Sequence, residues 1–82
     1  MPAFQFHIRW KEEIVCTGPD GQQLILEFGM GIPTAHLPTQ DAWPKKAPTW
    51  AHELWPQLHD ELKAFCAGHG YNFEVDERAM VF

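Results

Sequence analysis

The sequence predicts an α+β protein, in which one main helix packs across one face of a mostly antiparallel sheet. Three observations support this fold class. Apolar and polar residues alternate over 3–10, 22–28 and 71–75, as they do in strands that bury one face. One segment, 49–70, has the period of an amphipathic helix. A short charged connection and a turn separate the first three strands, so the expected order is β-β-β-(β)-α-β-β.

The first third of the chain is expected to form a three-stranded antiparallel meander. Residues 3–10 alternate, and residues 14–17 resume a β-rich composition after a short charged connection. The sequence GPDG at 18–21 is the clearest turn signal, because proline suits the second turn position and glycine supplies a positive φ. Residues 22–28 then form the third strand. The 82 residues are expected to make a single domain.

The segment 29–48 is expected to be largely irregular. It holds four of the seven prolines, and each proline removes a backbone donor. A short strand at 34–37 is expected between Pro33 and Pro38, at an edge of the sheet. Loops of this length in small domains usually carry function or cover part of the protein.

The helix at 49–70 is the element around which the rest is expected to pack. Its residues Leu54, Leu58, Leu62 and Phe65 fall on one apolar stripe, which should lie on the sheet. Thr49 is the expected N-cap, and Gly68 or Gly70 the expected end.

Pro56 leaves two alternatives for the start of this helix. A continuous helix from residue 50 would be bent at Pro56, whereas a short turn over 50–53 would let the main helix begin at Pro56. We favour the continuous, bent helix. Beyond it, 71–75 is expected to be a strand with Tyr71, Phe73 and Val75 inward, followed by a turn at 76–78 and a last strand at 79–82.

The charge and the cysteines limit the partners and the compartment. A net charge of −5 repels phosphate backbones, so nucleic-acid binding is not expected, whereas a basic protein partner would be attracted. The first ten residues lack the pattern of a secretory signal, and no apolar run is long enough to span a membrane. We therefore expect a cytoplasmic protein that does not bind membranes, with Cys16 and Cys66 as free thiols.

No set of residues has the spacing of a known catalytic or metal site, so no catalytic residue, metal or cofactor is expected. His52 and His59 would lie about 10 Å apart along a helix, which is too far for one zinc ion. An HExxH motif that begins at His52 has Pro56 in place of its second histidine. Cys66 falls beside the apolar stripe, where a buried small side chain is the simplest interpretation.

The tryptophans suggest a surface. Trp43, Trp50 and Trp55 lie within thirteen residues of one another, and either they cover the sheet or they are displayed to a partner. Burial is the favoured alternative, since a small domain has few large apolar side chains to spare. The residues of the predicted partner-binding surface are Trp43, Trp50, Glu53, Gln57, Asp60 and Glu61.

The function expected from these observations is non-enzymatic binding of another protein, through the proline- and tryptophan-rich loop and the acidic flank of the helix. In size, charge and layout the chain resembles many small bacterial proteins, some of which are immunity proteins that neutralise a toxin domain. That resemblance implies toxin neutralisation as one alternative. A small enzyme, metal-dependent or using His36, His52, His59 or a cysteine, is another. A homodimer through an edge strand, 34–37 or 79–82, is also possible on the pattern alone.

Overall fold

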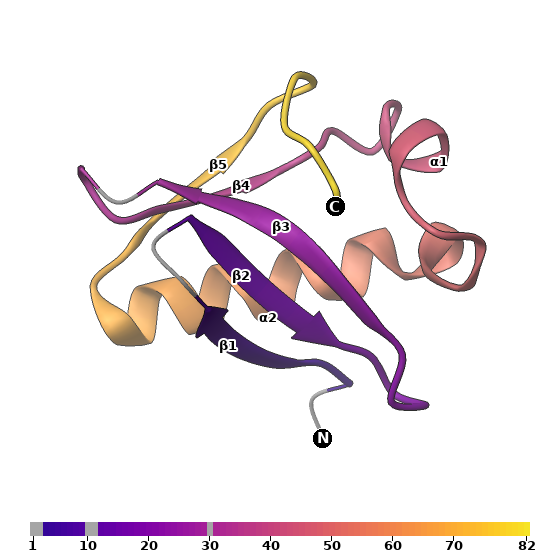
Figure 1. The fold of residues 1–82 in the computed structure, drawn as a ribbon, viewed down its shortest axis with the longest axis horizontal. Coiled ribbons are helices and arrows are strands. Elements are labelled where there is room, and N and C mark those ends of the chain that lie inside the picture. Colours follow the sequence, from indigo (N-terminus) through magenta and orange to yellow (C-terminus); the bar gives the residue numbers. More distant parts are fainter. Residues whose placement is uncertain (1–2, 10–11, 30) are drawn as a thin grey trace.

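The computed structural model describes residues 3–9, 12–29 and 31–82 (Figure 1). Five strands form one mixed sheet in the order β1-β2-β3-β4-β5. Neighbours from β1 to β4 are antiparallel, and β5 joins β4 in parallel, so the predicted α+β class with a mostly antiparallel sheet is confirmed. The strands are β1 (Gln5–Arg9), β2 (Glu13–Thr17), β3 (Gln23–Gly29), β4 (Thr34–Leu37) and β5 (Asn72–Val75).

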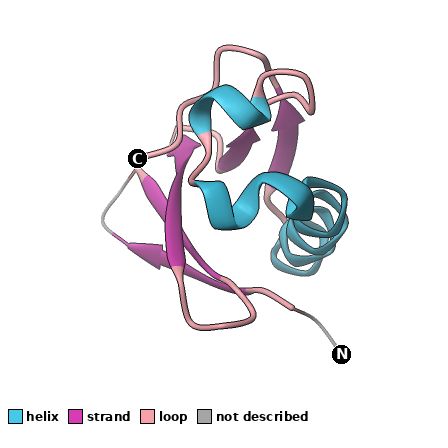
Figure 2. Cartoon of the chain, turned by 90° about the vertical axis from the view of Figure 1, so that its right-hand side faces the viewer, coloured by secondary structure: helices cyan, strands magenta, loops and turns pink. Residues whose placement is uncertain are grey.

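Three helical segments follow β4. They are α1 (Trp43–Lys46), the 3₁₀ helix η1 (Thr49–Leu54) and α2 (Trp55–His69). The helices gather on one side of the sheet, with α2 running across it (Figures 1 and 2). Because side chains alternate along each strand, the face away from α2 carries residues such as Arg9, Glu13, Glu27 and His36.

The predicted meander β1-β2-β3 is confirmed. The turn between β2 and β3 closes with a hydrogen bond from the Gly21 amide to the Gly18 carbonyl, 3.1 Å long. Gly21 has a φ of 84°, which a residue with a side chain rarely adopts. Residue 10, the last of the alternating segment 3–10 predicted as the first strand, lies outside the described residues.

The expectation that 34–37 forms an edge strand is wrong. β4 occupies those residues, but β3 pairs with it on one side and β5 on the other. After α2 the chain returns beside β4, and the Asn72 amide donates to the Pro33 carbonyl at 2.8 Å. The flanking prolines do not prevent this pairing, because the four residues between them supply the donors. Among the described residues, β1 and β5 are the outer strands.

The expected last strand at 79–82 is reduced to one isolated bridge, in which Val81 pairs with Leu26 of β3. It reaches β3 because β3 and β4 pair only through Phe28 and Gly29 and then separate. Val75, predicted to point inward, is 43% exposed, since it lies at the end of an outer strand.

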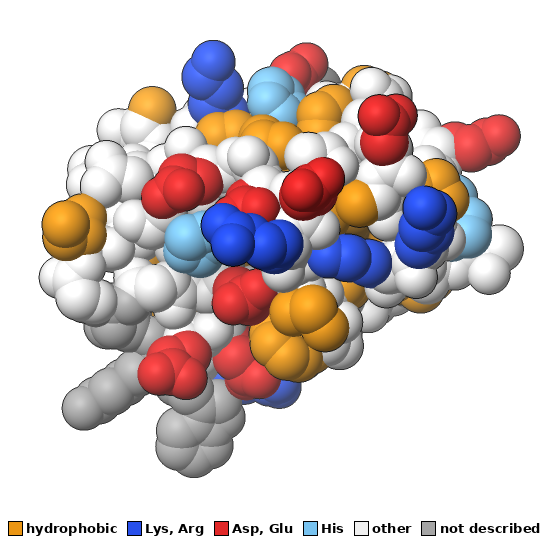
Figure 3. Space-filling view, turned by 90° about the horizontal axis from the view of Figure 1, so that it is seen from above, with side chains coloured by type: hydrophobic (Ala, Val, Ile, Leu, Met, Phe, Trp, Pro, Cys, Tyr) orange, Lys and Arg blue, Asp and Glu red, His pale blue; other side chains and the backbone are white. Residues whose placement is uncertain are grey.

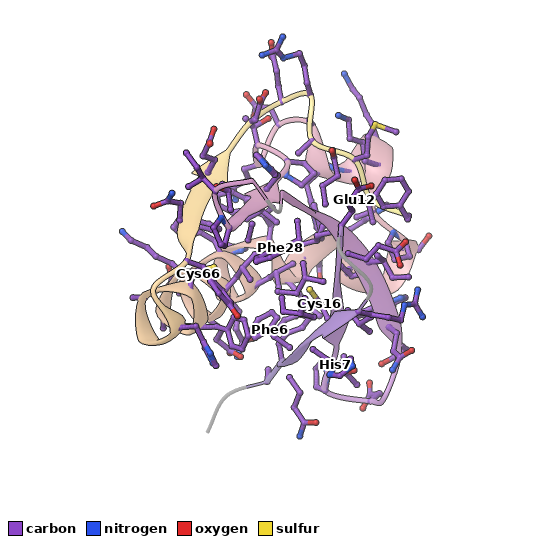
Figure 4. The ribbon with its side chains drawn as sticks, turned by 60° about the vertical axis from the view of Figure 1, so that its left-hand side comes forward. Phe6, His7, Glu12, Cys16, Phe28 and Cys66 are labelled. Carbon is purple, nitrogen blue, oxygen red and sulfur yellow. The ribbon has the colours of Figure 1, made fainter. Side chains whose placement is uncertain are left out.

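The predicted apolar stripe of the helix forms the centre of the core. Leu58 and Leu62 are fully buried, and Leu54 and Phe65 are partly buried against the same cluster. Cys16 of β2 and Cys66 of α2 are free thiols, as expected, and both are buried, which was predicted for Cys66 alone. Figure 4 shows the two cysteines in the space between the sheet and α2.

The structure overturns the favoured interpretation of Pro56. Residues 49–54 form the separate 3₁₀ helix η1, and α2 begins at Trp55, so Pro56 stands in its first turn. There the missing amide has no intrahelical partner to lose, which makes this the cheaper arrangement. Thr49 does not cap either segment through its side chain, because Pro48 precedes η1 and Leu54 precedes α2. Gly70 ends α2 as predicted, with a φ of 72°.

The segment 38–48 is less irregular than expected, because it contains α1. Pro44 stands in the first turn of that short helix, for the same reason that Pro56 stands in the first turn of α2. Trp43, the first residue of α1, is 1% exposed, and its indole N–H donates to the Ala51 carbonyl at 2.8 Å. The indole of Trp55 likewise donates to the Pro38 carbonyl at 2.8 Å. The tryptophans therefore hold the loop against the core.

Candidate functional site

The structure removes Trp43 from the predicted partner-binding surface, because a side chain that is 1% exposed cannot contact a partner. Trp50 is half-buried and packs against the core near Phe4, at a ring-centroid distance of 6.5 Å. It lies so close to Gly18 that a Cβ atom there would be 2.5 Å from a carbon of the indole ring. The two tryptophans thus serve mainly as a cover.

The acidic flank of the helix divides into one structural residue and three exposed ones. Both carboxylate oxygens of Glu61 accept backbone amides, from Ala3 at 3.0 Å and from Phe4 at 2.8 Å. Glu61 therefore ties the segment before β1 to α2. The exposed members of the flank are Glu53, Gln57 and Asp60. Asp60 also contacts Nδ1 of His59 at 3.0 Å.

A second acidic surface, which the sequence did not reveal, surrounds a hollow of about 490 Å³. The hollow lies where β2 begins and β3 ends, with β4 beside it, and we call it the acidic groove. In the space-filling view of Figure 3, acidic side chains lie near exposed hydrophobic ones, with Lys and Arg side chains among them. The groove is lined by Glu12, Glu13, Glu27, Phe28, Gly29, His36 and Phe82.

The carboxylates of the groove are placed against one another by the strand register. Glu13 and Glu27 are direct partners across the β2–β3 pair. Arg9 contacts one oxygen of Glu13 at 3.2 Å, and Glu27 accepts the Met80 amide at 2.6 Å. Glu12, immediately before β2, is exposed. Like charges directly opposite on a sheet repel, and the contacts with Arg9 and with the Met80 amide offset part of that repulsion.

Two large apolar side chains stand beside these carboxylates. Phe82 lines the groove and is 62% exposed, while Met80, two residues earlier, is 49% exposed. Exposed apolar residues rimmed by charge are typical of protein-binding surfaces. The groove thus places carboxylates, which attract positive charge, next to the exposed Phe82 ring, which can make apolar contacts.

The carboxylates of the acidic groove are suited to binding a positively charged side chain, and the described lining residues of the groove include no cysteine. Burial raises the pKa of both the Cys16 and the Cys66 thiol, so both stay protonated near neutral pH. Among the described residues, no three His, Cys, Asp or Glu side chains are placed to hold a metal ion. His36, His52 and His59 of the predicted alternative lie on three different elements, β4, η1 and α2.

The signal for the groove was present in the sequence but depended on the register. The GPDG turn determines which residues of β2 and β3 face each other, and it sets Glu13 opposite Glu27. Residues 11–13 were interpreted as a charged connection, so that pairing was not considered. The contribution of Phe82 depends on contacts distant in sequence and had no local signal.

The fold and the groove define a small protein with one sheet, one main helix and an acidic surface on the open face of the sheet. Comparisons of the chain with protein-family models, with curated proteins and with solved structures found no match. Within the part of the chain that the structure describes, no helix has the length and apolar character needed to cross a membrane.

Proposed function

We propose that this protein is a non-enzymatic binding module that recognises a basic protein partner through the acidic groove. The observation that carries the proposal is the direct pairing of Glu13 with Glu27 beside the exposed ring of Phe82. A lysine or arginine side chain from a partner would relieve the repulsion between the two carboxylates. Its alkyl part would lie along the phenylalanine ring.

The charge of the chain supports the same class of partner. A net charge of −5 accelerates the approach of a basic surface and disfavours acidic ones. Covering the basic surface of a toxin, as immunity proteins do, is one activity that uses such a groove. The exposed helix-flank residues Glu53, Gln57 and Asp60 form a rival surface for the same kind of partner.

A titration followed by NMR tests the proposal and separates the two surfaces. The probe is a capped peptide, Gly-Arg-Ser-Arg-Gly, and its counterpart with glutamate in place of arginine serves as the control. We expect saturable shifts at the amides of Glu13, Glu27 and Phe82, which weaken with added salt.

Matched variants sharpen the result. Replacing both groove carboxylates, Glu13→Gln with Glu27→Gln, should weaken arginine-peptide binding at least fivefold. Replacing two carboxylates of the helix flank, Glu53→Gln with Asp60→Asn, removes the same charge and should leave that binding unchanged. Shifts confined to the helix flank, or equal affinity of the two double variants, would refute the groove as the binding site.

A further inference from the structure

The edge of β3 that faces away from β2 pairs with two different segments, β4 and residues 79–82. At its end, Phe28 and Gly29 pair with β4. Nearer its middle, the edge is covered by segment 79–82, which makes the bridge between Val81 and Leu26. The Phe82 amide donates to the Ile25 carbonyl at 2.8 Å. A short segment from elsewhere in the chain therefore satisfies a strand edge that would otherwise be open to pairing.

Segment 79–82 binds this edge as an added strand would. Ala79 is 4% exposed and Val81 packs against the core, while Met80 and Phe82 point outward. This alternation is the pattern by which peptides that add a strand to a sheet are recognised, with backbone bonds for affinity and alternate side chains for specificity. The Met80 amide is held by a side chain, the Glu27 carboxylate, at 2.6 Å.

Beyond the edge of β3, further contacts hold the segment and the turn before it. The Lys46 ammonium, at the end of α1, donates to the carbonyls of Glu77 at 2.5 Å and Ala79 at 2.8 Å. In the turn before the segment, the Asp76 carboxylate accepts the Arg78 amide at 2.9 Å. None of these contacts belongs to the pairing of β1 to β5. Release of segment 79–82 from β3 would therefore leave the pairing of β1 to β5 intact, at the cost of exposing Ala79 and Val81.

We propose that the edge of β3 from Ile25 to Glu27 is a strand-docking site, occupied in this structure by segment 79–82 and open to an extended segment of a protein partner. The partner segment should carry small or β-branched apolar residues at alternate positions, as Ala79 and Val81 do. The inference rests on the proposed function in assuming a protein partner. It requires no positive charge on that partner, although the two sites share Glu27 and Phe82.

A competition experiment on the full chain tests the docking site. The probe is a fluorescent peptide with the sequence of residues 75–82, VDERAMVF, and its binding is measured by anisotropy. The variant Asp76→Ala loosens the turn before segment 79–82 and leaves the aspartate of the peptide intact, and Glu77→Ala, at an exposed neighbouring position, is the matched control. Because the bound segment competes with the peptide, we expect Asp76→Ala to bind it about threefold more tightly than the wild type or Glu77→Ala.

Specificity and local opening give independent readouts. A peptide with aspartate at the position of Val81, VDERAMDF, should not bind, since the Val81 side chain packs against the core. Hydrogen exchange of the Phe82 amide should be about threefold faster in Asp76→Ala, with the β1 and β2 amides unchanged. Lys46→Ala should also speed this exchange but should not tighten peptide binding, because the peptide loses the Lys46 contact as well.

The outcomes separate this inference from the proposed function. Glu13→Gln should weaken the arginine peptide and leave the affinity for VDERAMVF unchanged. Equal, weak binding of VDERAMVF to all variants, with no change in Phe82 exchange, would overturn the docking site while leaving the groove proposal standing. Dimerisation of Asp76→Ala in sedimentation, without peptide binding, would assign the edge to a second copy and likewise overturn the inference.

Discussion

Glu13 and Glu27 occupy directly opposed positions on β2 and β3, although a pair of opposite charges would stabilise the sheet there. Arg9 contacts one oxygen of Glu13 at 3.2 Å, but both residues of that ion pair are partly exposed, and such pairs contribute little. Each carboxylate also has a contact within the fold, Glu13 with Arg9 and Glu27 with the Met80 amide.

The first prediction concerns this repulsion. Glu27→Gln removes one charge and keeps an oxygen that can accept the Met80 amide. We expect the free energy of unfolding to rise by about 0.2–1 kcal/mol at low salt, and by less in 1 M salt. Urea denaturation at the two salt concentrations measures the change, with Glu53→Gln on the exposed surface as the control. A loss of stability in Glu27→Gln would contradict the repulsion.

The second prediction separates two neighbouring acids on α2. Glu61→Gln leaves one acceptor oxygen for the amides of Ala3 and Phe4, so one partly buried N–H loses its partner. We expect a loss of about 1–2 kcal/mol in the free energy of unfolding. Asp60→Asn alters an exposed side chain and should change stability by less than about 0.5 kcal/mol. Equal effects in thermal or urea unfolding would show that Glu61 does not hold the first strand.

The third prediction distinguishes the two possible starts of the helix. At a first-turn position, Pro56 costs no hydrogen bond and restricts the unfolded chain, so Pro56→Ala should lower stability by about 0.4–1 kcal/mol. A proline inside a continuous helix would give the opposite result, a gain of about 3 kcal/mol on replacement. Urea denaturation followed by circular dichroism decides between them. Pro44→Ala in α1, another proline in a first turn, is the control and should behave alike.

The elements that local patterns determine were predictable from the sequence. The β1-β2-β3 meander follows from alternation and one turn, and the stripe from Leu54 to Phe65 follows from a helical period. The position of β4 was not predictable, because it depends on where β5 returns after α2. The local sequence around Pro56 fits both a first-turn position and a position inside a longer helix, and only the packing of the chain distinguishes the two.

The candidate site shows the same division. Trp43 and Glu61 were grouped with exposed residues because they are adjacent to them in sequence. In the structure Trp43 is buried in the core, and Glu61 binds the backbone just before β1. The groove brings together residues 12, 27 and 82, whose proximity arises from the sheet register and from one bridge between Leu26 and Val81. No local pattern encodes that second contact.

The last prediction uses the two buried thiols. Burial raises the pKa of Cys16 above its ordinary value, and a charge on Cys66 would raise it further. A folded-state pKa above the unfolded one gives stability that is fully present below the unfolded pKa, about 8.5, and is lost as pH rises through the folded pKa. The free energy of unfolding should therefore fall as the pH rises from 8 to 10.

Cys16→Ala isolates this contribution. The variant should be less stable at neutral pH, because the alanine leaves a small cavity in the core, but its stability should fall less steeply above pH 8.5. Subtracting the two urea-denaturation curves cancels the lysine and tyrosine titrations that both proteins share. Parallel curves for the two proteins would contradict a buried thiol at position 16. In the native wild type, iodoacetamide should modify neither cysteine at pH 7.5, and both should react once the chain is unfolded in urea.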